Sequence, residues 1–173
     1  MKLTSEYIKN NYLILTVKLL IICLFIFRLI QGNIETSIYW NFVAETGSGL
    51  KNYFNVLKET SFYRPAIILL IPFIGIFINK KIGWILIQAY FYFLISNLIF
   101  PTEKSDLTDS TQFVALIVVF LIIVFFIILM SLKKIRNQVY GITKSKLIIY
   151  NIIASIFGMS MTIILALIKA AEI

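Results

Sequence analysis

Histidine is absent from this chain of 173 residues, which also has a single cysteine, three prolines and only eight acidic residues. Without histidine, the usual histidine-ligated haem and zinc sites cannot form. Cys23 has no second cysteine for an intrachain disulfide and no histidine to activate it as a nucleophile. Asp106 and Asp109, the only aspartates, fall in one short polar segment. We therefore expect a protein that is not an enzyme and has no catalytic residues, metal site or cofactor.

Hydrophobic side chains, by contrast, make up 60% of the residues, whereas charged side chains make up only 14%. Soluble globular domains typically contain about 45 to 50% apolar residues, so a soluble chain of this size could not bury the excess. Aromatic residues at 15% also exclude an intrinsically disordered or collagen-like chain. The composition predicts an integral membrane protein.

Five apolar blocks are long enough to cross a hydrocarbon core of about 30 Å, which takes roughly 17 to 25 helical residues. Inside lipid the backbone must satisfy its own hydrogen bonds, so each block is expected to be an α-helix. A transmembrane β-barrel would show shorter, alternating segments, and the unbroken apolar run 114–130 does not alternate. The sequence predicts one all-α integral membrane domain over residues 1–173, with five transmembrane helices, or four as the fallback, at 12–30, 62–78, 82–100, 113–132 and 147–168.

Lysine and arginine concentrate on one side of this five-helix arrangement. The N-terminus, the turn at 79–81 and the loop at 133–146 share that side, and their only acidic residue is Glu6. Basic residues in short loops are retained on the cytoplasmic side of a membrane. The lysine, isoleucine and asparagine usage suggests an AT-rich bacterial genome. We therefore expect a multi-pass protein of a bacterial cytoplasmic membrane, with its N-terminus inside and its C-terminus outside.

The loop at 133–146 has five basic residues and no acidic one. Anionic lipid headgroups attract such cations by about 1 kcal/mol for each Lys or Arg near the surface. A solvated loop that faces the lipid headgroups is therefore expected, and the net charge of +8 needs no nucleic acid to explain it. The expected headgroup-facing residues are Lys133, Lys134, Arg136, Lys144 and Lys146.

The segment 31–61 is predicted to be an outer loop with a turn at 45–49. After that turn, Leu50, Tyr53, Phe54 and Leu57 recur at the i, i+3, i+4, i+7 spacing of one helical face. This pattern predicts a short amphipathic helix lying in the outer membrane interface.

Small residues recur along the last block at the spacing of one helix face. Helix association in lipid depends on close backbone approach and interhelical hydrogen bonds, both of which small residues permit. The face is expected to pack against another helix, either of the same chain or of a second copy. Its residues are Ala154, Ser155, Gly158, Thr162 and Ala166.

Polar side chains inside the spans form a further candidate site. Lys18, Gln88 and Asn151 lie at similar depths, roughly 6 to 9 Å below the cytoplasmic interface at 1.5 Å per residue. Tyr92 and Ser96 continue from Gln88 along one face of the third span. We expect a polar layer in which Lys18, Gln88 and Asn151 converge. For Lys18 itself, snorkelling to the headgroups is one interpretation, and an anion or lipid-phosphate site or a pore lining is the other.

Two classes of function fit these features, and no family motif chooses between them. In the first, the chain is a non-enzymatic accessory subunit or membrane component of a larger complex and acts through helix–helix assembly with itself or a partner membrane protein. In the second, copies form a homo-oligomeric pore or channel, a class that includes membrane effectors of bacterial defence or toxin systems. A small-molecule or lipid transporter is a weaker third, because the two halves show no internal repeat.

Overall fold

The computed structural model describes residues 5–43, 56, 60–100 and 110–171, and in this part of the chain all regular structure is helical. The helices are α1 (Ser5–Val43), α3 (Arg64–Phe77), α4 (Lys81–Ile99), α5 (Ser110–Ser131), α6 (Lys133–Arg136) and α7 (Lys144–Ala171). By length and composition, α1, α4, α5 and α7 can each cross a membrane. The predicted all-α class is therefore confirmed for the described residues, with four helices long and apolar enough to span a membrane.

The predicted span 62–78 corresponds to α3, which has 14 residues and is not one of those four. At 1.5 Å per residue α3 is about 21 Å long, less than the hydrocarbon core. It ends at a tight turn into α4, in which Lys80 has extended backbone angles. Gly83 permits this turn, because a side chain there would collide with the carbonyl oxygens of Ile78 and Gly75. The five-span count is thus not confirmed.

The first helix is longer than predicted. Residues 31–43, which were expected to begin an outer loop, continue α1 to a total of 39 residues. Gln31 donates a hydrogen bond to Glu35 one turn later, at 2.8 Å, and Gly32 packs beneath the ring of Tyr63. Polar side chains end a hydrophobic span without ending a helix, so the outer-loop prediction was wrong for these residues. The predicted interfacial helix, with Leu50, Tyr53, Phe54 and Leu57, lies outside the described residues.

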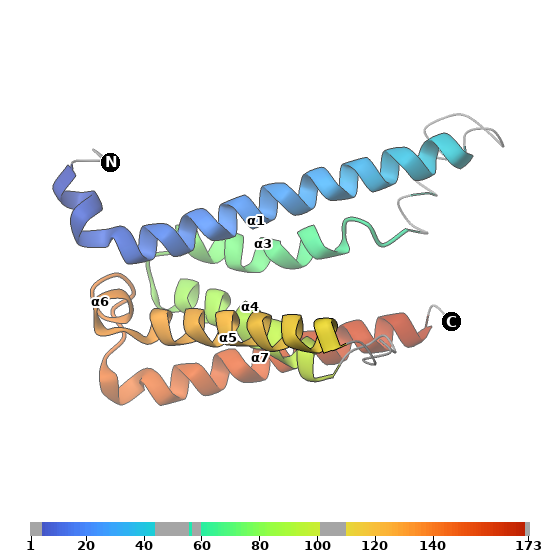
Figure 1. The fold of residues 1–173 in the computed structure, drawn as a ribbon. Coiled ribbons are helices and arrows are strands. Elements are labelled where there is room, and N and C mark those ends of the chain that lie inside the picture. Colours follow the sequence, from blue (N-terminus) through green and yellow to red (C-terminus); the bar gives the residue numbers. More distant parts are fainter. Residues whose placement is uncertain (1–4, 44–55, 57–59, 101–109, 172–173) are drawn as a thin grey trace.

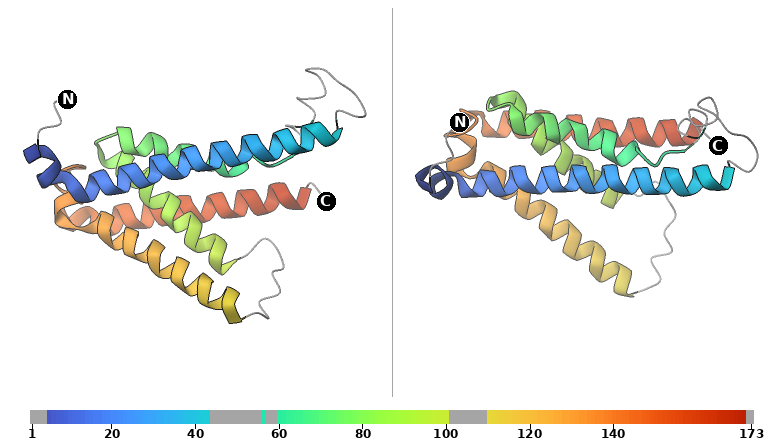
Figure 2. Two further views of the ribbon diagram at one scale, coloured as in Figure 1. Left: turned by 45° about the horizontal axis from the view of Figure 1, so that its top comes forward. Right: turned by 90° about the horizontal axis from the view of Figure 1, so that it is seen from above.

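Helix α4 is the centre of the bundle. It packs against α3, α5 and α7, and half of the residues in its apolar stretch are buried. Helix α1 packs mainly along α3, and both views in Figure 2 show α5 diverging from α1 and α7 toward its first residue. Only 17% of the residues in the apolar windows of α1, α5 and α7 are buried, as expected for helices surrounded by lipid.

The start of α1, the α3–α4 turn and α6 lie at one end of the bundle, and the C-terminus lies at the other (Figure 1). We call the first of these the basic end. Trp84 closes the core there: it is fully buried, and its indole N–H donates to the Met130 carbonyl oxygen at the end of α5, at 2.9 Å. A second contact between the same two helices is the stacked ring pair of Phe91 and Phe126, with centroids 5.7 Å apart.

The basic segment 133–146 is not the fully solvated loop that was expected. Arg136 is only 8% exposed, and its guanidinium donates to the Ile142 carbonyl oxygen at 3.2 Å. Tyr140 and Ile142 are also buried, and burial raises the pKa of the Tyr140 hydroxyl. Gly141, with φ of +66°, makes the reversal that turns both side chains inward. The prediction of a headgroup-facing side chain was therefore wrong for Arg136, because the apolar residues around it fold into the core.

The other four cations of this segment remain accessible to different extents. Lys133, Lys144 and Lys146 are exposed. Lys134 is half-buried, and its ammonium group lies 5.2 Å from the centre of the Tyr12 ring of α1, a cation–π distance. Their contact with lipid headgroups stays a prediction.

Candidate functional site

A polar network joins α4 to α7 inside the bundle. The Tyr92 hydroxyl donates to the Asn151 side-chain oxygen at 3.0 Å, and the Gln88 amide group donates to the same oxygen at 3.3 Å. Asn151 in turn donates to the Leu147 carbonyl oxygen at 3.1 Å. The structure thus brings together three of the predicted intramembrane polar residues: Gln88 and Tyr92 both donate to the side-chain oxygen of Asn151.

Gln88 extends this network to a third helix. Its side-chain nitrogen also lies 3.4 Å from the Ile127 carbonyl oxygen of α5. The residue is fully buried, and its side-chain oxygen has no hydrogen-bond partner in the described part of the chain. Buried amides in a membrane bundle are expected to hold helices together. Gln88 of α4 reaches both α5 and α7.

The small-residue face of α7 packs against α4 of the same chain. Ala154, Gly158 and Thr162 are buried, Ser155 is half-buried, and Ala166 is exposed and lies outside the contact. A Cβ atom at Gly158 would stand 2.5 Å from the Ala89 carbonyl oxygen and 2.7 Å from the Phe93 nitrogen. The two backbones touch at this glycine, so the face is occupied within one chain.

Asn97 completes the α4–α7 contact and was not singled out from the sequence. Its amide group donates to the Phe93 carbonyl oxygen at 2.9 Å and approaches the Thr162 hydroxyl at 3.3 Å. The neighbouring Ser96, which was chosen instead, is buried, and its carbonyl oxygen accepts the N–H of Phe100 at 2.8 Å. An asparagine within an apolar block was the available signal for Asn97.

Lys18 does not join Gln88 and Asn151, as had been expected. The half-buried lysine lines a cavity of about 300 Å³ between α1 and α3, and its ammonium group donates to the Asn79 side-chain oxygen at 3.0 Å. Equal depth in the membrane did not bring these residues together, because α1 packs mainly against α3 and not against α4 or α7.

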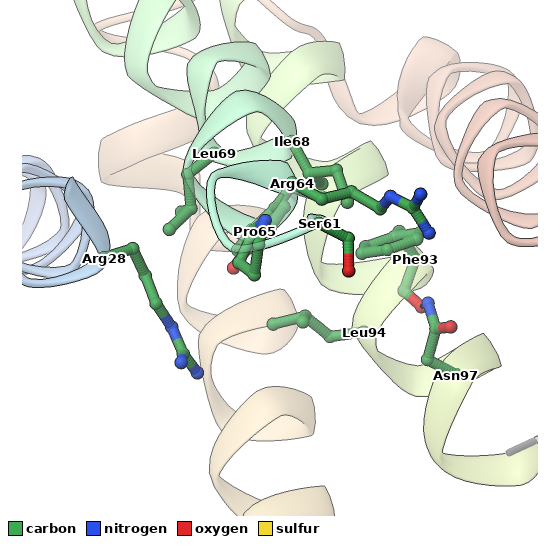
Figure 3. Close-up of a pocket in the computed structure, with 10 residues that line it drawn as sticks. Arg28, Ser61, Arg64, Pro65, Ile68, Leu69, Phe93, Leu94 and Asn97 are labelled. Atoms are coloured by element: carbon green, nitrogen blue, oxygen red, sulfur yellow. Dashed lines mark hydrogen bonds between the residues drawn. The ribbon is translucent and has the colours of Figure 1, made fainter. Parts of the chain in front are cut away.

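A second cavity between α1, α3 and α4, of about 330 Å³, lies toward the opposite end of the bundle. Figure 3 shows Arg28 of α1 on one side of it and Arg64 of α3 on the other, with Ser61 and Pro65 between them. Arg28 donates to the Gln31 side-chain oxygen at 2.7 Å, and Gln31 donates to the Glu35 carboxylate. The Arg28 guanidinium therefore lies at one end of a chain of hydrogen bonds that ends on a carboxylate.

Stacked aromatic rings separate these two cavities along the α1–α3 contact. Phe25 follows Ile22 of the Lys18 cavity and precedes Arg28, and it stacks on Phe73 of α3 with ring centroids 4.4 Å apart. Each cavity is therefore a separate recess, and Lys18 and Arg28 line different cavities.

Comparison of the chain with protein-family models, with curated proteins and with solved structures finds no match. Within the described residues, no group of three or more His, Cys, Asp or Glu side chains lies close enough to hold a metal ion. The chemistry that the described geometry offers is hydrogen bonding between helices in the α4–α7 network and cation–anion recognition in the cavities at Lys18 and Arg28.

Replacing Asn151 by leucine is expected to lower the thermal stability of the bundle, by about 1 kcal/mol on the scale of interhelical hydrogen bonds in membranes. The loss arises because the Tyr92 hydroxyl and the Gln88 amide share the Asn151 oxygen. A double-mutant cycle with Tyr92→Phe, followed by thermal unfolding in detergent, measures the coupling. In the Asn151→Leu background, Tyr92→Phe should cost little further stability; fully additive losses would contradict the network.

Proposed function

We propose that the protein is a non-enzymatic membrane component that acts by helix–helix assembly, as an accessory subunit of a larger complex that contains at least one further copy of this chain. The observation that carries the proposal is an exposed apolar stripe on α1. Phe27, Ile30, Ile34 and Ile38 recur at three- and four-residue spacing, and their side chains are 59%, 54%, 52% and 66% exposed.

Helix α1 is longer than a membrane crossing requires, and this excess length bears on what covers the stripe. The apolar stretch Asn11–Asn41 has 31 residues, and a helix tilted by the usual angle of about 20° needs only about 21 residues to cross the hydrocarbon core. If the crossing begins at Asn11 at the basic end, Ile34 and Ile38 lie beyond the lipid tails. Lipid cannot cover them there, so burial against another protein surface is the favourable alternative. One stripe presented by two identical helices is self-complementary, which supports a second copy as the occupant.

The internal packing of α4 and α7 supports assembly over the alternative of a pore. Gln88, Tyr92 and Asn151 bond to one another, and the small-residue face of α7 already packs on α4. A pore would need such polar side chains on an exposed helix face. The stacked Phe25 and Phe73 rings separate the two cavities beside α1, which also argues against a continuous transport path. Leakage of dye from liposomes containing the purified protein would favour the pore, including a bacterial defence or toxin effector.

The sidedness of the basic residues supports a bacterial cytoplasmic membrane with the N-terminus inside. Lys80, Lys81, Lys133, Lys144 and Lys146 are all exposed at the basic end. Positively charged segments stay on the cytoplasmic side, so this end would face the cytoplasm and the C-terminus would face out. A C-terminal reporter that is active only in the cytoplasm would contradict this orientation.

Changing Ile34 and Ile38 together to serine is expected to reduce self-association by at least tenfold, because the change removes the two stripe residues that lie beyond the lipid. Mass measurement in nanodiscs checks this: the unchanged protein should be larger than one chain of 20.0 kDa. The matched control is Ile163→Ser with Leu167→Ser on α7, where both side chains are equally exposed at 60% and 65%. Assembly that is unaffected by the α1 change, or a strictly monomeric unchanged protein, would refute the proposal.

A further inference from the structure

Two cavities adjoin at the basic end of the bundle. The Lys18 cavity, of about 300 Å³, and a second of about 550 Å³ beside the α3–α4 turn are both lined by Asn79 and Val139. Together they run from the exposed turn, where Lys80 and Lys81 stand, to Lys18 between α1 and α3. We call this combined recess the basic crevice.

The charged side chains that line the basic crevice are all positive. Lys18, Lys80 and Lys81 line it, and none of the described lining residues is Asp or Glu. The partner that the structure gives to the Lys18 ammonium group is the neutral side chain of Asn79. This arrangement differs from the cavity at Arg28, where hydrogen bonds lead to the Glu35 carboxylate. An anion in the basic crevice would supply the missing negative charge.

The walls of the crevice favour one kind of anion. Lys18 lies seven residues into the apolar stretch of α1, about 10 Å along the helix, whereas Lys80 and Lys81 are exposed at the turn. Beside Lys18 and deeper in the bundle, the wall is apolar and includes Ile22 and Phe77, the latter 68% exposed. Inorganic phosphate would leave that wall bare, whereas a lipid would cover it with an acyl chain and place its phosphate among the three ammonium groups.

We propose that the basic crevice is a binding site for one anionic phospholipid, with the phosphate held by Lys18, Lys80 and Lys81 and an acyl chain along α1 and α3. Lys18 then acts as a lipid ligand and does not merely extend toward the headgroups. The site does not depend on the assembly proposed above, since all of its residues belong to one chain.

Native mass spectrometry of the delipidated full chain, titrated with phosphatidylglycerol, tests the proposal. Removing one cation beside an anionic headgroup is expected to weaken binding about fivefold. Lys18→Gln should therefore bind the first phosphatidylglycerol about fivefold more weakly, and Lys18→Gln with Lys80→Gln roughly 25-fold more weakly. The matched control, Lys144→Gln with Lys146→Gln, removes two exposed lysines from the same end but outside the crevice. It should change the first binding step by less than twofold.

Three outcomes would overturn the proposal. Equal weakening by the control pair would mean that surface charge alone attracts the lipid. If phosphatidylcholine bound as tightly as phosphatidylglycerol, the crevice would not recognise the net negative charge of the lipid. Displacement of the lipid by millimolar inorganic phosphate would mean that the crevice takes a free anion. Should Lys18→Gln fail to fold, Lys80→Gln with Lys81→Gln, both at the exposed turn, carries the same expectation of roughly 25-fold weakening.

Discussion

Replacement of Gly158 by isoleucine is expected to destabilise the bundle by on the order of 3 kcal/mol, at the upper end of overpacking effects. Even the first added carbon would lie 2.5 Å from the Ala89 carbonyl oxygen and 2.7 Å from the Phe93 nitrogen. Both atoms belong to the α4 backbone, which cannot give way as a flexible side chain would. Helix α7 must therefore move off α4, and the hydrogen bonds that Asn151 and Thr162 make across the same contact are strained with it.

Ala166 on the same face of α7 provides the control, because its side chain is exposed. Ala166→Ile should leave the melting temperature in detergent nearly unchanged, whereas Gly158→Ile should lower it by many degrees. Circular dichroism at increasing temperature measures both. Equal melting temperatures for the two variants would show that α4 and α7 do not touch at Gly158.

Truncation of Trp84 to alanine should cost about 3 to 5 kcal/mol, the usual range for removing a large buried aromatic side chain. Trp84 is fully buried, and its indole N–H reaches the Met130 carbonyl oxygen at 2.9 Å. The substitution both opens a cavity and leaves the last turn of α5 without this donor. Since α5 packs mainly on α4, we expect α5 to become accessible to protease at the basic end before the other helices do.

Trp84→Phe separates the two contributions. It keeps most of the buried ring but loses the hydrogen bond, so it should cost about 1 kcal/mol. Thermal unfolding with limited proteolysis distinguishes the variants. If Trp84→Phe were as damaging as Trp84→Ala, the hydrogen bond and not the packing of the ring would hold α5 in place.

Hydrophobic run length predicted α4, α5 and α7 to within a few residues of their observed bounds, because lipid requires each apolar block to close its own backbone hydrogen bonds. The four-residue repeat in α7 similarly predicted a packed face at Ala154, Gly158 and Thr162. It could not name the partner helix, because small residues allow close approach by any helix. That α4 is the partner follows from three-dimensional packing alone.

The errors have a common cause. The end of the first apolar block at residue 30 predicts an outer loop after it, whereas Gln31 and Glu35 bond to each other within α1. The cluster of basic residues predicts that Arg136 faces the headgroups, whereas Arg136, Tyr140 and Ile142 are all buried. Similar depth predicts that Lys18 meets Asn151, whereas the choice of neighbouring helix decides lateral position. Polarity along a sequence indicates where a hydrophobic span ends and how deep a residue lies in it. It does not show where the helix itself ends or which helices contact each other.

In a bilayer, the unequal lengths of the helices would produce a hydrophobic mismatch. At 1.5 Å per residue, α3 is about 21 Å long and α4 about 28 Å, whereas the apolar stretch of α1 reaches about 46 Å. No uniform hydrocarbon thickness fits all three, and a bilayer adjusts to such differences by thinning beside short segments and thickening or tilting beside long ones. Helices α1 and α3 are neighbours, so in a bilayer the largest difference in hydrophobic length falls along one side of the molecule. We therefore expect acyl-chain length to determine how far Ile34 and Ile38 project beyond the lipid tails.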